Sequence, residues 1–177
     1  MKVITAIEKF TERKDENDIF CFLAGGITNC AEWQDEVLDL LKDEDDHLII
    51  FNPRRKEFPI NDPSASFEQI KWEFNHLSNC DIFSMYFDGT EQSDQPICFY
   101  ELGKYLTEMK YVFTSNWEDR IVISCNSNFK RSADVTIQTM LATKGKIKIN
   151  NSYDFNELNE MHANSIKNAY RKLKGYI

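Results

Sequence analysis

The chain has 177 residues and a formal net charge of −8. Its hydrophobic fraction of 42% supplies enough side chains for a buried core, which argues against a disordered chain. The acidic balance argues against sequence-independent binding of nucleic acids, because such proteins need a basic face that displaces counterions. A small-molecule ligand fits this composition better.

Targeting signals and metal-binding motifs are not evident in the sequence. No apolar run approaches the roughly 20 residues that a helix needs to cross a bilayer. The N-terminal segment MKVITAIEKFTERKDEND carries charges where a secretion signal needs an apolar stretch, so we expect a cytoplasmic protein without membrane contact. The five cysteines form no CxxC pair and the three histidines are scattered. We therefore expect reduced, mostly buried thiols, no metal ion and no organic cofactor.

Short apolar runs alternate along the chain with segments of helical periodicity. The apolar runs predict five strands, at 19–24, 48–51, 82–87, 120–125 and 146–149. Apolar residues at helical spacing predict helices, at 32–41, 67–77, 97–106, 133–143 and 155–173. The segment 111–114 is compatible with either strand or loop.

The helix predicted at 67–77 has a recognisable start and one apolar face. Ser66 is expected to cap it, with Gln69 at the capping-box position. Ile70, Phe74 and Leu77 lie on the same face at helical spacing.

This alternation predicts an α/β three-layer sandwich in which a five-stranded parallel sheet has helices on both faces. We expect one domain over residues 1–177, with a core of about 19–150 and a C-terminal helix at about 155–173. In such sheets ligands bind beyond the carboxyl ends of the strands, at the switch in strand order. The loops 25–30, 52–65 and 88–96 should therefore border the site.

Two carboxylates are candidates for chemistry at this edge. Glu101 lies in QPICFYELGKYL near a predicted helix start, where the helix dipole stabilises an anion by roughly 0.3–1 kcal/mol. Glu73 follows Trp72 and precedes Phe74, and apolar surroundings raise the pKa of a carboxyl group. A carboxylate nucleophile paired with a carboxylic acid can cleave a glycosidic bond. Taken alone, a glutamate in such a setting is more often a surface or capping acid, and this holds for both residues.

Five segments occur in an order that points to a known family. They are FLAGGI (22–27), NPRR (52–55), FEQIKWE (67–73), NCDI (79–82) and QPICFYELG (95–103). The set resembles the nucleoside 2-deoxyribosyltransferase-like family, in particular its branch with an FLAGxI, NPRR, QIxWE and QPxxxxELG pattern. DVTIQT (134–139) is similar to a late segment of that branch, so the resemblance covers about residues 19–142.

The resemblance implies a flavodoxin-like fold and cleavage of the N-glycosidic bond of a (deoxy)nucleoside or nucleotide. Glu101 would attack C1′ of the sugar, and the glycosyl-enzyme intermediate would pass the sugar to another base or to water. Glu73 would contact the sugar or help proton transfer to the leaving base. The loop of Gly25, Gly26 and Ile27 would lie against the sugar or its 5′ substituent, where glycine lets the backbone approach closely.

Two positions depart from the family pattern. Phe22 stands where the best-known transferases have a tyrosine whose hydroxyl orients the nucleophile, which puts efficient transfer in question. Asp94, Gln95 and Pro96 stand where that branch has acidic residues that read the base, so Gln95 is a candidate base contact of a different kind.

Other candidate site residues have two interpretations each. Arg54 and Arg55 could bind a 5′-phosphate through bidentate contacts or pair with local acids. Asp81 could be a strand-entry residue or a sugar contact. Asn126 could complete the pocket of a neighbouring subunit, because family sites often lie at subunit interfaces, or form a loop turn.

We therefore expect an enzyme, an N-(deoxy)ribosyltransferase or N-glycosidase, that works as a homo-oligomer. Two alternatives stay open. One is a nucleotide-binding or sensing module of the same fold with little catalysis, which Phe22 favours. The other is a flavodoxin-like interaction protein unrelated to nucleosides.

Overall fold

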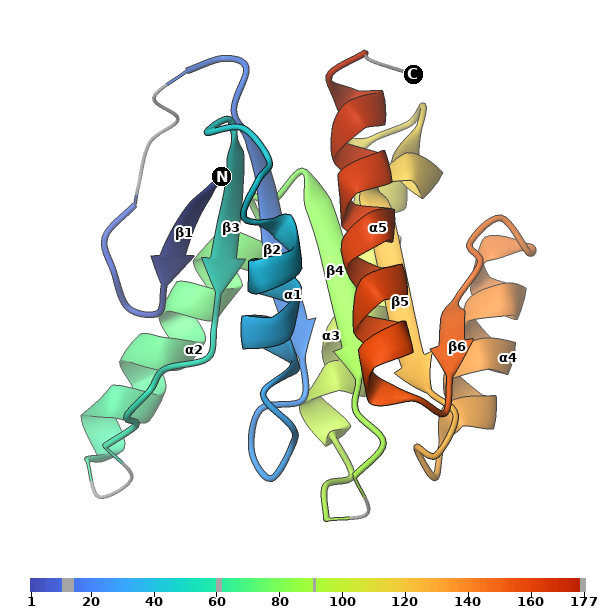
Figure 1. Cartoon of the computed structure of the whole chain (residues 1–177), viewed down its shortest axis with the longest axis horizontal. Coiled ribbons are helices and arrows are strands. Elements are labelled where there is room, and N and C mark those ends of the chain that lie inside the picture. Colours follow the sequence, from blue (N-terminus) through green and yellow to red (C-terminus); the bar gives the residue numbers. More distant parts are fainter. Residues whose placement is uncertain (11–14, 60–61, 91, 176–177) are drawn as a thin grey trace.

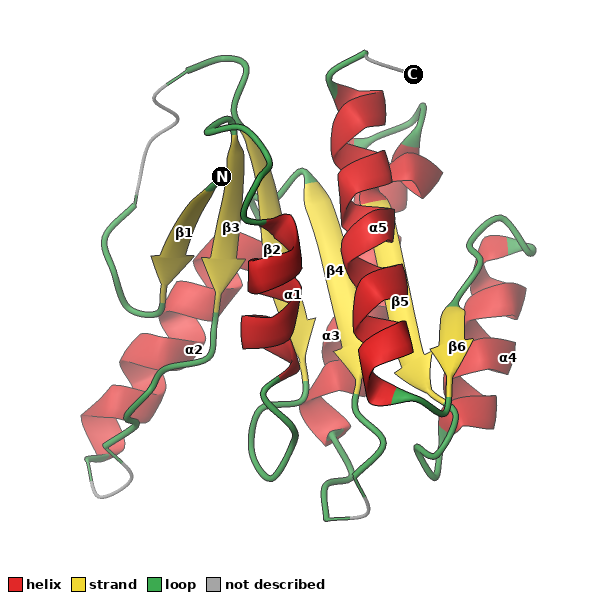
Figure 2. Cartoon of the chain, in the orientation of Figure 1, coloured by secondary structure: helices red, strands yellow, loops and turns green. Residues whose placement is uncertain are grey.

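The computed structural model describes residues 1–10, 15–59, 62–90 and 92–175. The described residues form a six-stranded parallel sheet between two layers of helices (Figure 1, Figure 2). The strands are β1 (Lys2–Thr5), β2 (Ile19–Gly25), β3 (Leu48–Asn52), β4 (Ile82–Phe87), β5 (Ile121–Asn126) and β6 (Asn150–Ser152). The helices are α1 (Trp33–Leu41), α2 (Pro63–Leu77), α3 (Pro96–Val112), α4 (Ser132–Thr143) and α5 (Phe155–Leu173), with a 3₁₀ turn η1 (Trp117–Arg120) before β5.

The strand order places a crevice in the middle of the sheet. The order is β1-β3-β2-β4-β5-β6, with every neighbouring pair parallel. Without β1, this is the 2-1-3-4-5 order of flavodoxin-like folds, as predicted. The chain runs outward from β2 to β3 and then crosses back to β4. The connections that leave β2 and β4 therefore diverge at their carboxyl ends, which is where such folds bind ligands.

Two apolar cores hold the layers together. Helices α1 and α5 cover one face of the sheet, and α2, α3 and α4 cover the other (Figure 1). Trp33 and Leu41 of α1 pack with Ile166 of α5 on the first face. Leu102 and Leu106 of α3 belong to the core of the second. Each such side chain contributes roughly 1.5–3 kcal/mol through burial, so the strand ends that carry the site are firmly held.

The sheet differs from the prediction at both edges. The prediction of five strands missed β1, a four-residue strand that pairs with β3 through Lys2 and Ile49. The last strand was expected at 146–149 but pairs with β5 only at Asn150–Ser152. Ile147 is buried in the core, so the alternating pattern there reflects packing rather than strand pairing. The ambiguous segment 111–114 contains the end of α3.

Helix α2 begins earlier than predicted and exposes most of its apolar face. The expected Ser66 cap is wrong, because Asp62 caps the helix and accepts a hydrogen bond from the Ser64 amide at 2.9 Å. Leu77 is buried, but Ile70 is 63% and Phe74 is 55% exposed. The shared face predicted for these three residues is therefore only partly a core face.

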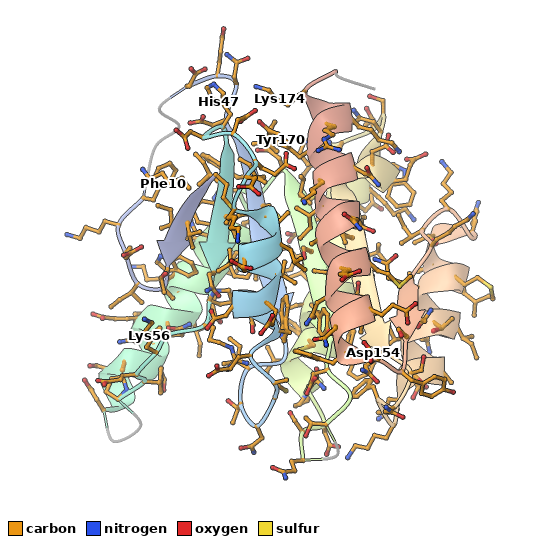
Figure 3. All side chains as sticks on the ribbon, in the orientation of Figure 1. Phe10, His47, Lys56, Asp154, Tyr170 and Lys174 are labelled. Atoms are coloured by element: carbon orange, nitrogen blue, oxygen red, sulfur yellow. The ribbon has the colours of Figure 1, made fainter. Side chains whose placement is uncertain are left out.

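Helix α5 occupies the predicted residues and is anchored at both ends (Figure 3). Asp154 caps its start by accepting a hydrogen bond from the Glu157 amide at 2.8 Å. Near its end, the Tyr170 hydroxyl donates a hydrogen bond to Asp45, in the turn before β3. None of the helices in the described part of the chain is both long and apolar enough to cross a membrane.

Candidate functional site

A cavity of about 270 Å³ lies at the carboxyl ends of β2 and β4, between α2 and α3. It therefore occupies the switch point in strand order. Its lining comes from four parts of the chain: Phe22, Ala24, Gly25, Gly26, Ile27 and Thr28 around the end of β2; Pro53 after β3; Glu73 of α2; and Ser93, Gln95, Pro96, Ile97, Cys98 and Glu101 around the start of α3. Residues 60, 61 and 91 belong to the loops predicted to border the site and lie outside the described residues.

Glu101 is placed by the way α3 begins. Pro96 occupies the first helical position, where its fixed φ suits a helix and its missing N–H costs nothing. Glu101 then falls on the second turn and lines the cavity. Burial raises its pKa to about 8, helped by the negative charge of Glu73 and opposed by Lys104. The predicted stabilisation of the Glu101 anion by the helix dipole is therefore outweighed, and Glu101 is largely protonated at neutral pH.

Glu73 approaches the same cavity from α2. Burial raises its pKa as well, which the apolar neighbours in the sequence had suggested. A hydrogen bond from Gln69 Nε2 to Glu73 Oε1, 2.7 Å long, acts in the opposite direction. The structure thus brings together the two carboxyl groups that the sequence singled out, and they interact electrostatically.

The glycine loop after β2 is tight because the protein itself fills the space around it. Gly25 has a φ of 153°, and a Cβ there would lie 2.4 Å from the Tyr86 carbonyl oxygen. A Cβ at Gly26 would lie 2.5 Å from the Cys30 sulfur and 2.6 Å from Gln95 Oε1. Trp33 Nε1 also donates a hydrogen bond to the Gly26 carbonyl at 2.9 Å. Both glycines are required by these contacts, in addition to any approach of a ligand.

Gln95 closes the loop on the β4 side. It has a left-handed backbone (φ 47°), and its side chain exchanges two hydrogen bonds with the backbone of Asp88, at 3.0 and 2.8 Å. Both the oxygen and the nitrogen of the Gln95 side-chain amide are therefore hydrogen-bonded to the backbone, although Gln95 also lines the cavity. Phe22 is also in the lining, 1% exposed and beside Trp72.

Comparison with known proteins now identifies the family. The sequence profile described as "Nucleoside 2-deoxyribosyltransferase like" matches residues 18–118. The chain belongs to this family. The matched region contains β2, both carboxylates and every residue that lines the cavity. Membership supports a glycosyl-transfer or nucleoside-related role. A comparison with curated proteins gives no match.

The arginines of the family-like NPRR segment lie outside the cavity lining. Arg54 donates hydrogen bonds to Gln34 Oε1 and to the Ala31 carbonyl, both at 2.8 Å, and to the Ile27 carbonyl at 3.3 Å. Arg54 thus fastens the loop after β2, and these partners are amide and carbonyl oxygens rather than acids. The guanidinium of Arg55 lies over the Phe58 ring at 5.5 Å.

Two further predicted site residues are not brought to the cavity. Asp81 lies directly before β4, at the amino-terminal ends of the strands and therefore at the opposite end from the cavity. Its carboxylate accepts a hydrogen bond from the Phe20 amide at 2.9 Å. Of the two interpretations of Asp81, this contact agrees with a strand-entry residue. Asn126 ends β5 and accepts a hydrogen bond from the Asn128 amide at 2.9 Å, forming a loop turn.

Sequence reasoning missed several residues of the site. Gln69 was interpreted only as part of a helix cap, although its position four residues before Glu73 was a usable signal. Thr28, Pro53, Ser93 and Cys98 line the cavity without a recognisable motif. All five cysteines are free thiols and four are buried, as expected. Among the described residues, no three His, Cys, Asp or Glu side chains are grouped so that they could hold a metal ion.

Proposed function

We propose that this protein cleaves the N-glycosidic bond of a (deoxy)nucleoside, with Glu101 as nucleophile and Glu73 as its acid–base partner. The observation that carries the proposal is the pair of partly buried carboxyl groups at one cavity, where the charge of Glu73 helps raise the pKa of Glu101 to about 8. Neighbouring acids with pKa values raised in this way are typical of catalytic sites. Membership of the nucleoside 2-deoxyribosyltransferase-like family supports a nucleoside as the substrate.

The chemistry follows from one proton shared by the pair. Before substrate binds, the raised pKa of Glu101 favours placing that proton on Glu101. On substrate binding it passes to Glu73 and then to the departing base, which takes the electron pair of the C1′–N bond. The Glu101 carboxylate forms a bond to C1′. In the second step another base, or water, attacks C1′, the ester bond breaks, and the proton of the incoming group returns to the pair.

The charge of the lining favours a neutral substrate. The described residues around the cavity include two acids and neither lysine nor arginine. A 5′-phosphate placed there would lie near two carboxyl groups, and no basic residue of the described lining would pair with it, which is costly in a partly buried site. We therefore propose a nucleoside rather than a 5′-nucleotide.

We also propose a cytoplasmic homo-oligomer that associates through the exposed apolar residues of α2 and α3. Phe67, Ile70 and Phe74 of α2 and Ile97 and Tyr100 of α3 are each more than half exposed. Lys104 lies over the Phe74 ring at 4.3 Å and so joins the two helices. Contiguous apolar surface of this kind is typical of interaction sites. Ile97 also lines the cavity, so a neighbouring subunit seated there would border the site.

The test is release of free base from a panel of ribo- and deoxynucleosides and their 5′-phosphates, with and without a second base, followed by chromatography. Wild type should release or exchange base, and Glu101→Gln should not. Glu68→Gln, an exposed acid on α2, is the matched control and should retain full turnover. Turnover by Glu101→Gln at the wild-type rate would contradict the proposal.

One observation favours a second candidate, a nucleoside-binding or sensing module. Phe22 places a ring without a hydroxyl in the lining, so this residue cannot orient the nucleophile by a hydrogen bond. Such a module would bind a nucleoside tightly in calorimetry while chromatography detects no free base.

A further inference from the structure

Gln69 links Glu73 to the backbone that follows β3 through two hydrogen bonds. The two residues lie four apart on α2, so their side chains share one face of the helix. Gln69 Nε2 donates one hydrogen bond to Glu73 Oε1 at 2.7 Å and another to the Pro53 carbonyl at 2.8 Å. Pro53 directly follows β3 and lines the cavity together with Glu73. The position of Glu73 is therefore set by the sheet as well as by its own helix.

The orientation of the Gln69 amide follows from the chemistry of its partners. A carbonyl oxygen and a carboxylate oxygen both accept hydrogen bonds, and only the nitrogen end of an amide carries two donors. The opposite orientation would set an acceptor against two acceptors. A hydrogen bond donated to a carboxyl oxygen favours the ionised form of that group. Gln69 thus selects for a negative charge on Glu73.

Glu101 has no equivalent donor. Among the described residues, none donates a hydrogen bond to its carboxyl group, although the charge of Lys104 favours its ionised form. The two acids of the cavity therefore differ in one respect that the sequence does not show. One carboxyl group is held by a dedicated donor and the other is not.

We propose that Gln69 is a positioning residue that keeps Glu73 ionised and fixed at the cavity, so that the single proton of the pair rests on Glu101. The inference rests on the proposed function, because it assigns the proton that glycosyl transfer requires. Glu73 Oε1 is engaged by Gln69, so Oε2 is the oxygen that remains for the ligand. Gln69 acts through Glu73 and has no direct role at the reacting atoms.

The experiment is a carboxyl titration that needs no substrate. The full-length protein is labelled with ¹³C at the glutamate side-chain carbons, and the chemical shifts of Glu73 and Glu101 are followed from pH 3 to 10. Glu73→Gln and Glu101→Gln assign the two signals. Gln69→Met keeps the length of the side chain and removes the donor. It should raise the titration midpoint of Glu73 by about one pH unit.

Two further variants keep the test decisive. Gln138→Met, an exposed substitution of the same kind on α4, should leave both midpoints unchanged. Gln69→Glu replaces the donor with a group that ionises and should raise the Glu73 midpoint further. It also serves if Gln69→Met does not fold. Midpoints that equal the wild-type values in the Gln69 variants would overturn the proposal.

The same variants separate this proposal from the proposed function. If wild type releases base, the acid limb of its pH–rate profile should move to higher pH in Gln69→Met, because Glu73 then ionises only at a higher pH. A merely structural role would lower the rate without moving this limb. If wild type releases no base, the proposed function fails, and the titration alone still decides whether Gln69 places the proton.

Discussion

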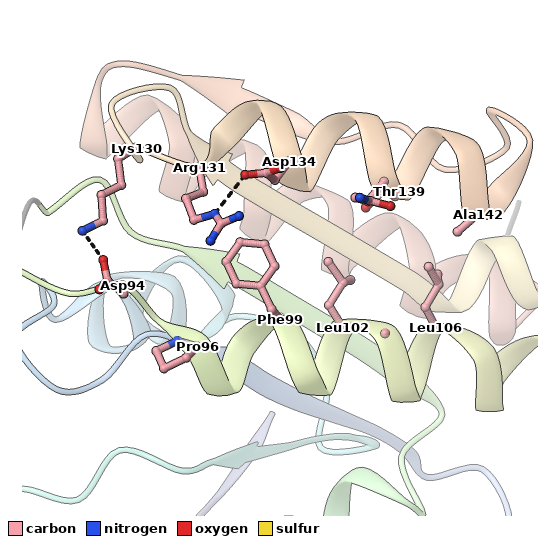
Figure 4. A pocket seen from close by; sticks show the side chains of 12 residues that line it. Asp94, Pro96, Phe99, Leu102, Leu106, Lys130, Arg131, Asp134, Thr139 and Ala142 are labelled. Atoms are coloured by element: carbon pink, nitrogen blue, oxygen red, sulfur yellow. Dashed lines mark hydrogen bonds and ion pairs between the residues drawn. The ribbon is translucent and has the colours of Figure 1, made fainter.

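Helix α3 borders two hollows that differ in how their charges are balanced. The groove on its α4 side has a volume of about 1010 Å³, against about 270 Å³ for the cavity on its α2 side. In the groove, Lys130 pairs with Asp94, and Arg131 Nε pairs with Asp134 at 2.9 Å, above an apolar floor from α3 (Figure 4). The smaller cavity is lined by two acids, with no basic residue in the described lining.

This difference teaches that unbalanced charge is a better indicator of chemistry than volume. Paired charges at the mouth of a groove change the stability of the protein little, since exposed ion pairs contribute about 0–1 kcal/mol. An unpaired carboxylate beside a second carboxyl group in a partly buried site costs stability, and folded proteins keep such arrangements mainly where function requires them. Substitutions on either side of α3 can test this difference.

Replacing Glu73 should have the largest effect. Glu73→Gln removes the partner that relays the proton, so base release should fall on the order of 10²- to 10⁴-fold. It also removes the negative charge that raises the pKa of Glu101, so the alkaline limb of the remaining activity should move below pH 8. Glu68→Gln is the control. A pH–rate profile of Glu73→Gln that keeps the wild-type limb would contradict the electrostatic coupling of the pair.

Gly26→Ala should disrupt the packing of the cavity wall. The new Cβ would lie 2.6 Å from Gln95 Oε1, and Gln95 cannot move without losing two hydrogen bonds to Asp88. We expect a loss of about 1–3 kcal/mol in the free energy of unfolding. The displaced loop should also slow base release by about 10- to 100-fold. Urea denaturation and the chromatographic assay measure the two effects, and wild-type values in both would show that the loop is not tightly packed.

Glu101→Gln should stabilise the protein, and only at higher pH. In the folded state Glu101 has a pKa of about 8, above the ordinary value of 4.5. As pH rises between these values, the unfolded chain ionises first, so the wild type loses stability while the glutamine variant does not. After allowance for solvent screening, we expect a gain of about 1–2 kcal/mol at pH 8.5 and almost none at pH 4. Thermal melts across this range provide the measurement, and equal gains at both pH values would refute the assigned pKa direction.

Gly103→Ala on the groove side should have the smallest effect, with the opposite sign to Gly26→Ala. Gly103 lies inside α3, and a Cβ there would meet no atom within 4 Å. Alanine suits a helix interior better than glycine, so we expect a gain of about 0.5–1 kcal/mol in the free energy of unfolding. Base release should be unchanged. A large loss of activity would show that this side of α3 also belongs to the functional site.

Much of the fold could be predicted because its signals are local. The alternation of apolar runs and helical periods gave β2 to β5 and all five helices, and the strand order then followed the flavodoxin-like pattern. The edge strands were harder to predict, because β1 has four residues and β6 has three, too few for a clear period. The exposed Ile70 and Phe74 show that an apolar helical face does not by itself identify the core.

The candidate site was predicted in part. The segments around Glu73 and Glu101 placed both acids at one crevice, because parallel strands bring their following loops to the same edge. The protonation states could not be predicted, since they depend on burial and on the Gln69 hydrogen bond across α2. The structural role of Arg54 could not be predicted from the sequence either, because its partners are carbonyl groups of a loop more than 20 residues away.

The central claim, that Glu101 forms a bond to the sugar, can be tested most directly by mass spectrometry. Wild-type protein is mixed with a nucleoside that it cleaves, quenched in acid after a few turnovers, and digested for peptide analysis. The account predicts a peptide whose mass is increased by one (deoxy)ribosyl group at Glu101, and no such peptide from Glu101→Gln. Release of base by wild type with an adduct on another residue, or with none when hydrolysis is slowed at low temperature, would contradict it.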